Sequence, residues 1–200
     1  MLSRRTLIAS LATLASPVKL ALPASARPMR YALDPDAARV GFIYTVSGGE
    51  QTGQMPITRA DVIIDPVYMA ASTVDVVLNP ARVRTGFFFA TEALKSQSML
   101  DTDQFPDIRF TSTEVQLSSS GRLSDGATLI GDLTVRDITR TVTLEAALFR
   151  PRGTAADDLS VLTIILSGAI SRSAFGASGY RDLVADTVKL DVEATIRAMG

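Results

Sequence analysis

The sequence predicts an all-β protein whose antiparallel strands close into a barrel or stack as a sandwich. Two observations support this fold class. Apolar and polar residues alternate with a period of two through much of the chain after residue 26. Turn signals such as Asn79-Pro80 and Ser120-Gly121 separate the alternating segments at short intervals. Only the segment TEALKSQSML at 91–100 has the pattern of a helix.

Six segments show the alternation most clearly and are expected strands: 38–46, 72–79, 127–137, 141–149, 158–171 and 188–196. In most of them every second residue is apolar, which is typical of a strand with one face on a core and one face in water. The segment at 158–171 is partly apolar on both faces. We therefore expect its outer face to be covered or to contact a partner.

The residues expected to face inward are apolar, and two of them, Gly131 and Ala146, are small. A glycine within a strand predicts a bend or a close approach of other atoms at that point. This composition suits a small barrel, whose interior is filled by side chains or holds one small ligand. A cavity of this kind would bind hydrocarbon and a solidly packed core would bind nothing. The residues leave both alternatives open.

The expected helix begins with Thr91 as its N-cap, directly ahead of Glu92. Three consecutive aromatic residues, Phe87, Phe88 and Phe89, precede it. They would form a hydrophobic lid over a cavity, an exposed patch for a membrane or a partner, or part of the core.

The composition argues against most kinds of catalysis. The chain contains no His, no Cys and no Trp. It therefore lacks a Ser-His-Asp triad and the usual ligands of zinc, copper, haem and iron–sulfur clusters. Disulfides and thiol redox chemistry are absent for the same reason. We expect no catalytic residue and no metal site. The alternative is a hydrolase that uses a carboxylate such as Asp101 or Asp186.

Residues 1–26 have the pattern of a cleavable secretory signal peptide, with a basic start, a short apolar run and a small-residue site at its end. The pair Arg4-Arg5 is compatible with either the twin-arginine or the Sec route. We therefore expect a periplasmic protein with one domain at 27–200. Because Arg4, Arg5 and Lys19 lie in the signal, the remaining chain carries a net charge of about −4, and nucleic acid is not an expected partner.

Four segments carry a resemblance to a known family: 31–46, 96–113, 130–146 and 170–196. The most specific is SQSMLDTDQFPDIRFTST at 96–113, followed by the LTVRDIT element at 133–139. In their order and spacing they resemble the YceI family of periplasmic polyisoprenoid-binding, lipocalin-like proteins. The resemblance covers residues 31–197.

The resemblance implies an eight-stranded antiparallel lipocalin-like barrel with one or two short helices. It implies that the interior holds an isoprenoid lipid, such as a quinone tail or a polyprenyl lipid, as a bound ligand and that no other cofactor is needed. It further implies a b-type membrane cytochrome as a partner. Two positions depart from the family pattern: Tyr44 stands where members often have His, and Asp137 stands where they usually have Gly. Tyr44 keeps an apolar ring with a polar tip, so a head-group contact is retained as an expectation.

Strand parity and the turn at 171–176 predict which residues contact a ligand inside the barrel. They are Phe42, Tyr44, Val46, Val74, Val76, Leu78, Phe105, Phe110, Leu129, Leu133, Val135, Val142, Leu144, Leu148, Phe175, Val188, Leu190 and Val192. Arg172 is expected either to contact the polar head group of the lipid or to hold its turn by donating hydrogen bonds to backbone carbonyls.

The expected function is that of an exported, non-catalytic carrier or sequestering protein for a polyisoprenoid or another long amphiphile. The first alternative is a structural or stress-associated scaffold with a packed core, which would form a homodimer through apolar outer positions at 164–166. The second alternative is the carboxylate-dependent hydrolase.

Overall fold

The computed structural model describes residues 27–118, 125–155 and 157–199, so the expected signal peptide and the turn at Ser120-Gly121 lie outside the described residues. The strands are β1 (Met29–Val46), β2 (Gly49–Met55), β3 (Ile57–Ile64), β4 (Thr73–Leu78), β5 (Arg84–Thr85), β6 (Ile108–Leu117), β7 (Ala127–Val135), β8 (Ile138–Phe149), β9 (Val161–Ser171) and β10 (Val184–Ala198). The helical elements are α1 (Phe88–Lys95) and the short 3-10 turns η1 (Met69–Ala71), η2 (Pro80–Arg82) and η4 (Ser173–Phe175).

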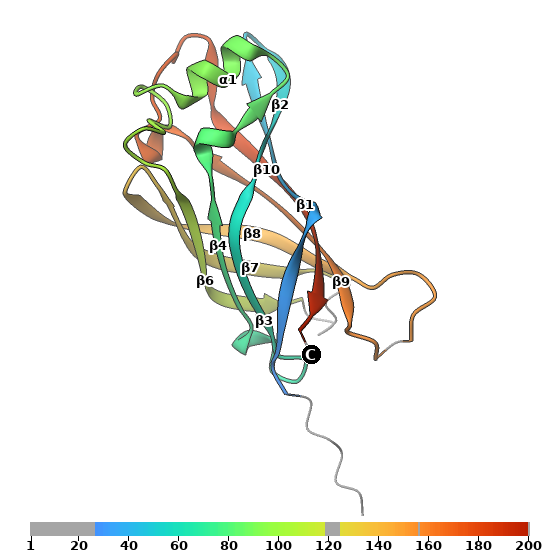
Figure 1. The fold of residues 1–200 in the computed structure, drawn as a ribbon. Helices are drawn as coiled ribbons and strands as arrows, with labels where there is room; N and C mark the ends of the chain where they lie inside the picture. Colours follow the sequence, from blue (N-terminus) through green and yellow to red (C-terminus); the bar gives the residue numbers. More distant parts are fainter. Residues whose placement is uncertain (1–26, 119–124, 156, 200) are drawn as a thin grey trace, which may run out of the picture.

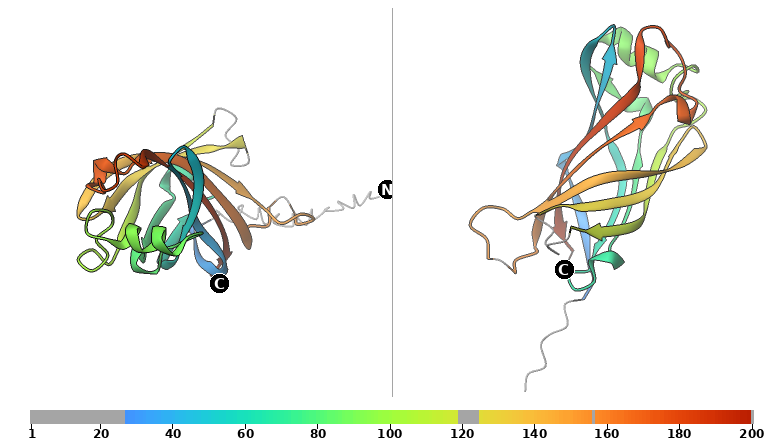
Figure 2. Two further views of the ribbon diagram at one scale, coloured as in Figure 1. Left: turned by 90° about the horizontal axis from the view of Figure 1, so that it is seen from above. Right: turned by 180° about the vertical axis from the view of Figure 1, so that it is seen from behind.

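Eight of the strands form a closed antiparallel barrel, which confirms the predicted fold class (Figures 1 and 2). Their order around the wall is β1, β3, β4, β6, β7, β8, β9 and β10, and β10 pairs again with β1. The closing seam is long, since it runs from Tyr31 opposite Ala198 to Val46 opposite Val184. Among the described residues, no helix is long and apolar enough to cross a membrane.

The strands β2 and β3 behave as one strand that is interrupted at Pro56. The upper half of β1 pairs with β2, for example Val40 with Met55, whereas its lower end pairs with β3, for example Tyr31 with Val62. Proline has no N–H to donate to a ladder, so regular pairing breaks at this residue. β2 thus continues the wall upward and carries β5 at its outer edge.

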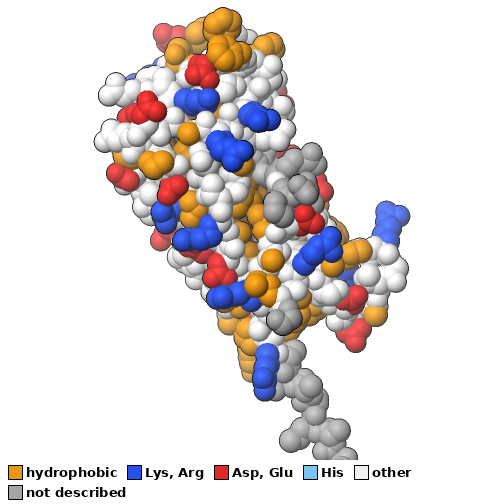
Figure 3. Space-filling view, viewed as in Figure 1, with side chains coloured by type: hydrophobic (Ala, Val, Ile, Leu, Met, Phe, Trp, Pro, Cys, Tyr) orange, Lys and Arg blue, Asp and Glu red, His pale blue; other side chains and the backbone are white. Residues whose placement is uncertain are grey.

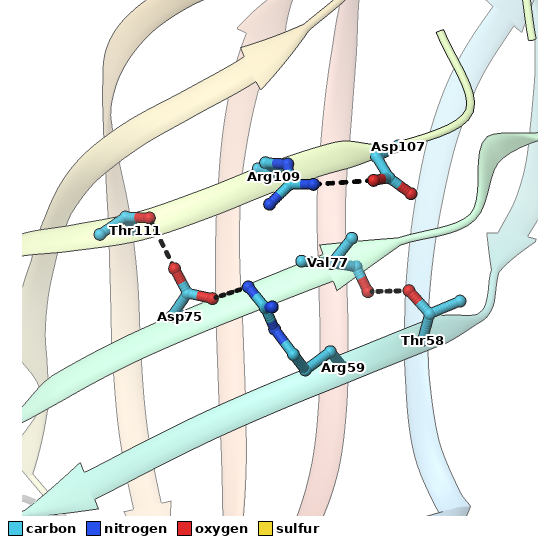
Figure 4. A network of polar contacts seen from close by, with 7 residues as sticks. All are labelled: Thr58, Arg59, Asp75, Val77, Asp107, Arg109 and Thr111. Atoms are coloured by element: carbon cyan, nitrogen blue, oxygen red, sulfur yellow. Dashed lines mark hydrogen bonds and ion pairs between the residues drawn. The ribbon is translucent and has the colours of Figure 1, made fainter.

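The outer face of β3, β4 and β6 is polar, as the alternation predicts (Figure 4). One carboxylate, that of Asp75, accepts hydrogen bonds from Arg59 Nη2 at 3.0 Å and from Thr111 Oγ1 at 2.9 Å. These contacts link three neighbouring strands. Because the groups are exposed, each contributes little free energy, but opposite charges across strands favour the observed register over its alternatives.

Two hydrophobic clusters occupy the inside of the barrel. The upper cluster, beneath α1, contains Met55, Val83, Ile108, Leu133, Val135 and Phe175. The lower cluster contains Tyr31, Val62, Ile64, Leu162 and Ile196. Tyr31 is almost fully buried, and its hydroxyl donates to Leu159 O at 2.9 Å. Burial raises the pKa of this phenol above its usual value. The lower cluster closes that end of the barrel.

The helix differs from the prediction. α1 begins at Phe88, three residues before the expected start, and ends at Lys95. Thr91 lies inside the helix and is not its N-cap; its hydroxyl instead accepts a hydrogen bond from Thr85 N at 3.1 Å. The residue at the N-cap position is Phe87, which makes no side-chain capping hydrogen bond. Contact with β5 fixes this end of the helix, so tertiary structure overrides the local capping signal.

Gly131 in β7 allows a close approach, as its position in a strand predicted. A Cβ atom at this residue would lie 2.5 Å from Phe110 Cζ and 2.6 Å from Thr111 O. We expect Gly131→Ala to lower the free energy of unfolding by about 2 kcal/mol, because a methyl group overpacks this contact and displaces the Phe110 ring. Urea denaturation followed by circular dichroism would measure the loss.

Gly86 provides the control for this substitution. No atom lies within 4 Å of the Cβ position of Gly86, so Gly86→Ala is expected to change stability by less than about 0.5 kcal/mol. If Gly131→Ala and Gly86→Ala lost equal free energy of unfolding, the close contacts of Gly131 with Phe110 and Thr111 would not be the cause of the loss.

Candidate functional site

An apolar cavity of about 810 Å³ runs through the described part of the barrel between α1 and the lower cluster. This volume is near the upper end of the usual range for small-molecule sites. The core therefore does not pack solid. Twelve residue steps separate Val184 from Ile196, which both contribute to the wall. At about 3.3 Å per residue and a strand tilt of about 40°, the cavity is about 30 Å long.

The mouth of the cavity lies between α1 and the loop at 176–183. Three large side chains there line the cavity and are also exposed: Phe89, Tyr180 and Leu183. The loop is held beside the segment after α1 by a hydrogen bond from Gly179 N to Ser98 O of 2.8 Å. Figure 3 shows hydrophobic side chains gathered at this end of the molecule. A ligand that enters here would pass an apolar rim.

The three aromatic residues at the start of α1 fill two of the three roles considered for them. Phe87, Phe88 and Phe89 are all exposed, and the exposed fraction reaches 84% at Phe89. Only Phe89 also forms part of the cavity wall. The rings of Phe88 and Phe89 meet edge to face at 5.8 Å. They form a partial lid and a surface patch, and none of them belongs to the buried core.

Most of the residues expected to contact a ligand lie on this cavity wall. They are Phe42, Tyr44, Val46, Val74, Val76, Leu78, Phe110, Leu133, Val135, Val142, Leu144, Phe175, Val188, Leu190 and Val192. Arg172 lies on the wall as well. These side chains come from six strands and from η4 with its N-cap residue, so the barrel brings together residues that are far apart in the chain.

Three of the expected residues lie outside the wall. Leu129 is buried and Leu148 packs against the lower cluster, but the cavity reaches neither of them. Phe105 lies in the loop before β6, where the guanidinium of Arg136 stacks over its ring at 5.7 Å from the centroid. Strand parity predicts the face on which a side chain lies, but it does not predict its height along the barrel axis.

Several wall residues escaped the sequence analysis. Met99, Tyr180 and Leu183 lie in loops, where no periodicity marks them. Ile57 and Val62 of β3 carry a weak signal, because a register shift between Ile57 and Arg59 interrupts their alternation.

The apolar positions 164–166 of β9, expected to lie on the outer surface, are divided between the two faces of the strand. Ile164 and Leu166 line the cavity, while Ile165 faces outward and is 40% exposed. The expectation that all three residues are outer positions was therefore wrong for Ile164 and Leu166. Side chains in a strand alternate strictly, so three consecutive residues cannot share one face.

Arg172 is buried, with only 7% of its surface exposed, and its guanidinium holds the turns around it. Its Nη1 donates to Ala177 O at 2.6 Å and to Gly179 O at 2.8 Å. Its Nη2 donates to Val184 O at 2.8 Å and its Nε to Ala185 O at 3.0 Å. Four of its five N–H groups thereby donate to backbone carbonyls. Arg172 thus holds its turn through hydrogen bonds, which is the second of the two roles expected for it.

The two carboxylates considered for catalysis, Asp101 and Asp186, lie outside the cavity wall. Hydrogen bonds from Ser171 and Ser173 lower the pKa of Asp186 below its usual value, with a further contribution from the charge of Arg172. The backbone of Asp101 ties down the loop after α1, since its N–H donates to Ser96 O and its carbonyl accepts from Phe105 N. Glu92, at the mouth, is the one acidic residue on the described wall, and it pairs with Lys95.

The fold and the cavity define a class of protein: a closed antiparallel barrel with a long apolar interior. The family model of the YceI-like domain matches residues 31–196, and the chain belongs to the YceI family. A UPF0312 protein of Yersinia enterocolitica is 38% identical over 79 residues, which is 40% of this chain and 38% of that protein. A UPF0312 protein of Yersinia pestis matches to the same extent. The chain thus matches well under half the length of these curated relatives.

Solved structures share the fold at low sequence identity. BcnA of Burkholderia cenocepacia covers 82% of this chain and 99% of its own, with a TM-score of 0.71 and 18% identity. A polyisoprenoid-binding domain of Saccharophagus degradans, implicated in plant cell wall breakdown, covers 86% and 100%, with a TM-score of 0.62 and 13% identity. A Campylobacter jejuni YceI protein covers 71% and 81%, with a TM-score of 0.56 and 21% identity. At these identities the likeness concerns the fold.

Proposed function

We propose that this protein binds a polyisoprenoid or a similar long-chain lipid inside its barrel and carries or sequesters it without catalysis. The observation on which the proposal rests is the apolar cavity of about 810 Å³. Membership of the YceI family supports it, as does the shared fold of the Saccharophagus degradans domain, which is described as polyisoprenoid-binding. The proposal takes the bound lipid, such as a quinone or a polyprenyl lipid, as the ligand and requires no further cofactor.

The shape of the cavity suits a chain better than a compact molecule. A cavity about 30 Å long takes an extended tail along its axis. Burying each CH₂ group contributes about 0.8 kcal/mol. A long tail therefore binds tightly without a charged anchor. The buried lower cluster and the exposed apolar rim at the mouth support an orientation with the tail toward the lower cluster and the polar end near α1.

Affinity is expected to rise with tail length until the cavity is full. Each added CH₂ group should lower the dissociation constant about four-fold, and the increase should stop at one length. The measurement is a calorimetric titration of the ligand-free protein with a series of isoprenoid alcohols delivered from cyclodextrin. Equal affinities for short and long tails would contradict the proposal.

Mass spectrometry of the organic extract of gently purified protein tests the same proposal by looking for a lipid that co-purifies with it. A stoichiometric isoprenoid quinone or polyprenol would support it and identify the ligand. A protein that carries no lipid and also takes up none in the titration would contradict it.

The hydrolase alternative loses support from the positions of Asp101 and Asp186, which do not face the cavity.

We also propose that residues 1–26 direct export to the periplasm, by either the Sec or the twin-arginine route. A periplasmic carrier has access to the lipids of the membranes on both sides. If the cargo is a quinone, a b-type membrane cytochrome is the proposed partner, because it would exchange electrons with the quinone head group. A homodimer through the outer face of β9, where Ile165 is exposed, is compatible with this role.

A further inference from the structure

Tyr44 introduces a polar atom into an otherwise apolar part of the cavity. It lies in the upper half of β1, opposite Val188 of β10 and Gln51 of β2, and it forms part of the cavity wall. Its ring packs against that of Phe42 with centroids 5.9 Å apart. Among the described residues, Tyr44 Oη is the one buried side-chain oxygen or nitrogen that has no hydrogen-bond partner.

A buried hydroxyl without a partner is unusual, because burial removes its hydrogen bonds to water at a considerable cost. Tyr31 shows the common solution within the same barrel: its hydroxyl reaches a backbone carbonyl, that of Leu159, at 2.9 Å. Tyr44 reaches no protein group. A phenylalanine would provide the same ring without this cost, and the hydroxyl of Tyr44 is therefore available for a role toward a ligand in the cavity.

The charges around the cavity limit what that role can be. Arg172 is the one cation on the described wall, and backbone carbonyls engage most of its guanidinium. The acid Glu92 lies at the mouth and pairs with Lys95. A phosphate drawn in to the depth of Tyr44 would find most N–H donors of this guanidinium already occupied and no other Lys or Arg on the described wall. Burying an anion without direct hydrogen-bonded pairing is strongly unfavourable.

We propose that the lipid in this cavity presents a neutral oxygen acceptor, such as a carbonyl, ether or hydroxyl oxygen, to the hydroxyl of Tyr44, and that lipid phosphates are excluded from that depth. This inference rests on the proposed function and adds the chemical class of the ligand. It also fixes the orientation, because Tyr44 lies toward the mouth and the lower cluster closes the opposite end. The phenol donates and the oxygen of the ligand accepts.

The substitution Tyr44→Phe removes the hydroxyl and keeps the ring. The probes are a long-chain ketone, the hydrocarbon of the same length and the matching alkyl phosphate, titrated calorimetrically from cyclodextrin. We expect the unsubstituted protein to bind the ketone roughly five-fold more tightly than the hydrocarbon and to bind the phosphate least. In Tyr44→Phe the preference for the ketone over the hydrocarbon should disappear, while the affinity for the hydrocarbon stays the same or rises.

Tyr68→Phe is the matched control, since it makes the same change at an exposed residue that lies outside the cavity wall. It should leave all three affinities unchanged. Thermal unfolding of the ligand-free proteins provides a second measurement: Tyr44→Phe should be at least as stable as the unsubstituted protein, because it loses an unpartnered group. A less stable Tyr44→Phe would mean that a protein group already satisfies the hydroxyl, and would overturn the inference.

The outcomes separate this inference from the proposed function. If the ketone and hydrocarbon bind equally in both proteins, or if the phosphate binds best, the inference is overturned while lipid binding stands. If none of the three probes binds the unsubstituted protein, lipid binding in the cavity is itself refuted, and the inference falls with it.

Discussion

Replacing Arg172 with methionine is expected to lower the free energy of unfolding by about 4 kcal/mol, which is large for a single substitution. The guanidinium donates to the carbonyls of Ala177, Gly179, Val184 and Ala185. Hydrogen bonds from a charged group to a buried acceptor are stronger than neutral ones, and carbonyls left without donors lose their solvation as well. Methionine fills a similar volume but offers no donor.

Urea denaturation at neutral pH measures this loss, and two further variants identify its cause. Arg172→Lys keeps the charge but lacks the planar fork, so it should lose most of the same stability. Arg84→Met removes an exposed arginine from β5 and is expected to change stability by less than about 0.5 kcal/mol. If Arg172→Met were as stable as Arg84→Met, the hydrogen bonds of Arg172 would not be what holds the turns in place.

The role of Arg172 connects the stability of the barrel with access to its cavity. The carbonyls that it binds belong to the loop at 176–183 and to the start of β10. This loop carries Tyr180 and Leu183, which form part of the rim. A single buried cation therefore fixes one side of the mouth, while contact with β5 fixes α1 on the other side.

The alternation of residues was sufficient to predict antiparallel strands and the face on which many of the cavity-lining side chains lie. In β10, Val188, Leu190 and Val192 lie on the cavity as expected, because side chains of a strand alternate strictly between its two faces. The same argument placed the first strand correctly from Val40 to Val46. Closure into eight strands followed from the family resemblance, since alternation alone is equally compatible with a sandwich.

Other features depend on contacts that no local pattern records. The start of α1 is set by packing on β5. The depth of the cavity depends on where the barrel is closed, so parity could not separate Leu144, which lines it, from Leu129, which does not. The lining residues Met99 and Leu183 come from loops, whose conformation depends on the hydrogen bonds around Arg172. The unpartnered hydroxyl of Tyr44 becomes evident only when all its neighbours are placed.

Ala194→Phe is expected to shorten the longest tail that the cavity accepts. Ala194 lies on β10 opposite Ile164, is 6% exposed and forms part of the wall near the lower cluster. A phenyl ring there would occupy the space that the end of the tail fills. Each excluded CH₂ group costs about 0.8 kcal/mol, so excluding four lowers the affinity for a long lipid by about 3 kcal/mol, on the order of a hundred-fold.

The effect should depend on tail length, which distinguishes occlusion from general damage to the fold. Lipids short enough to end above Ala194 should bind as they do to the unsubstituted protein, and the ligand-free variant should be at least as stable, because the ring fills empty apolar space. Ala169→Phe, which adds the same ring to an exposed position of β9, should change no affinity. Calorimetric titration of the three proteins with the series of isoprenoid alcohols measures this. An equal loss of affinity at every length would place the bound tail elsewhere in the barrel.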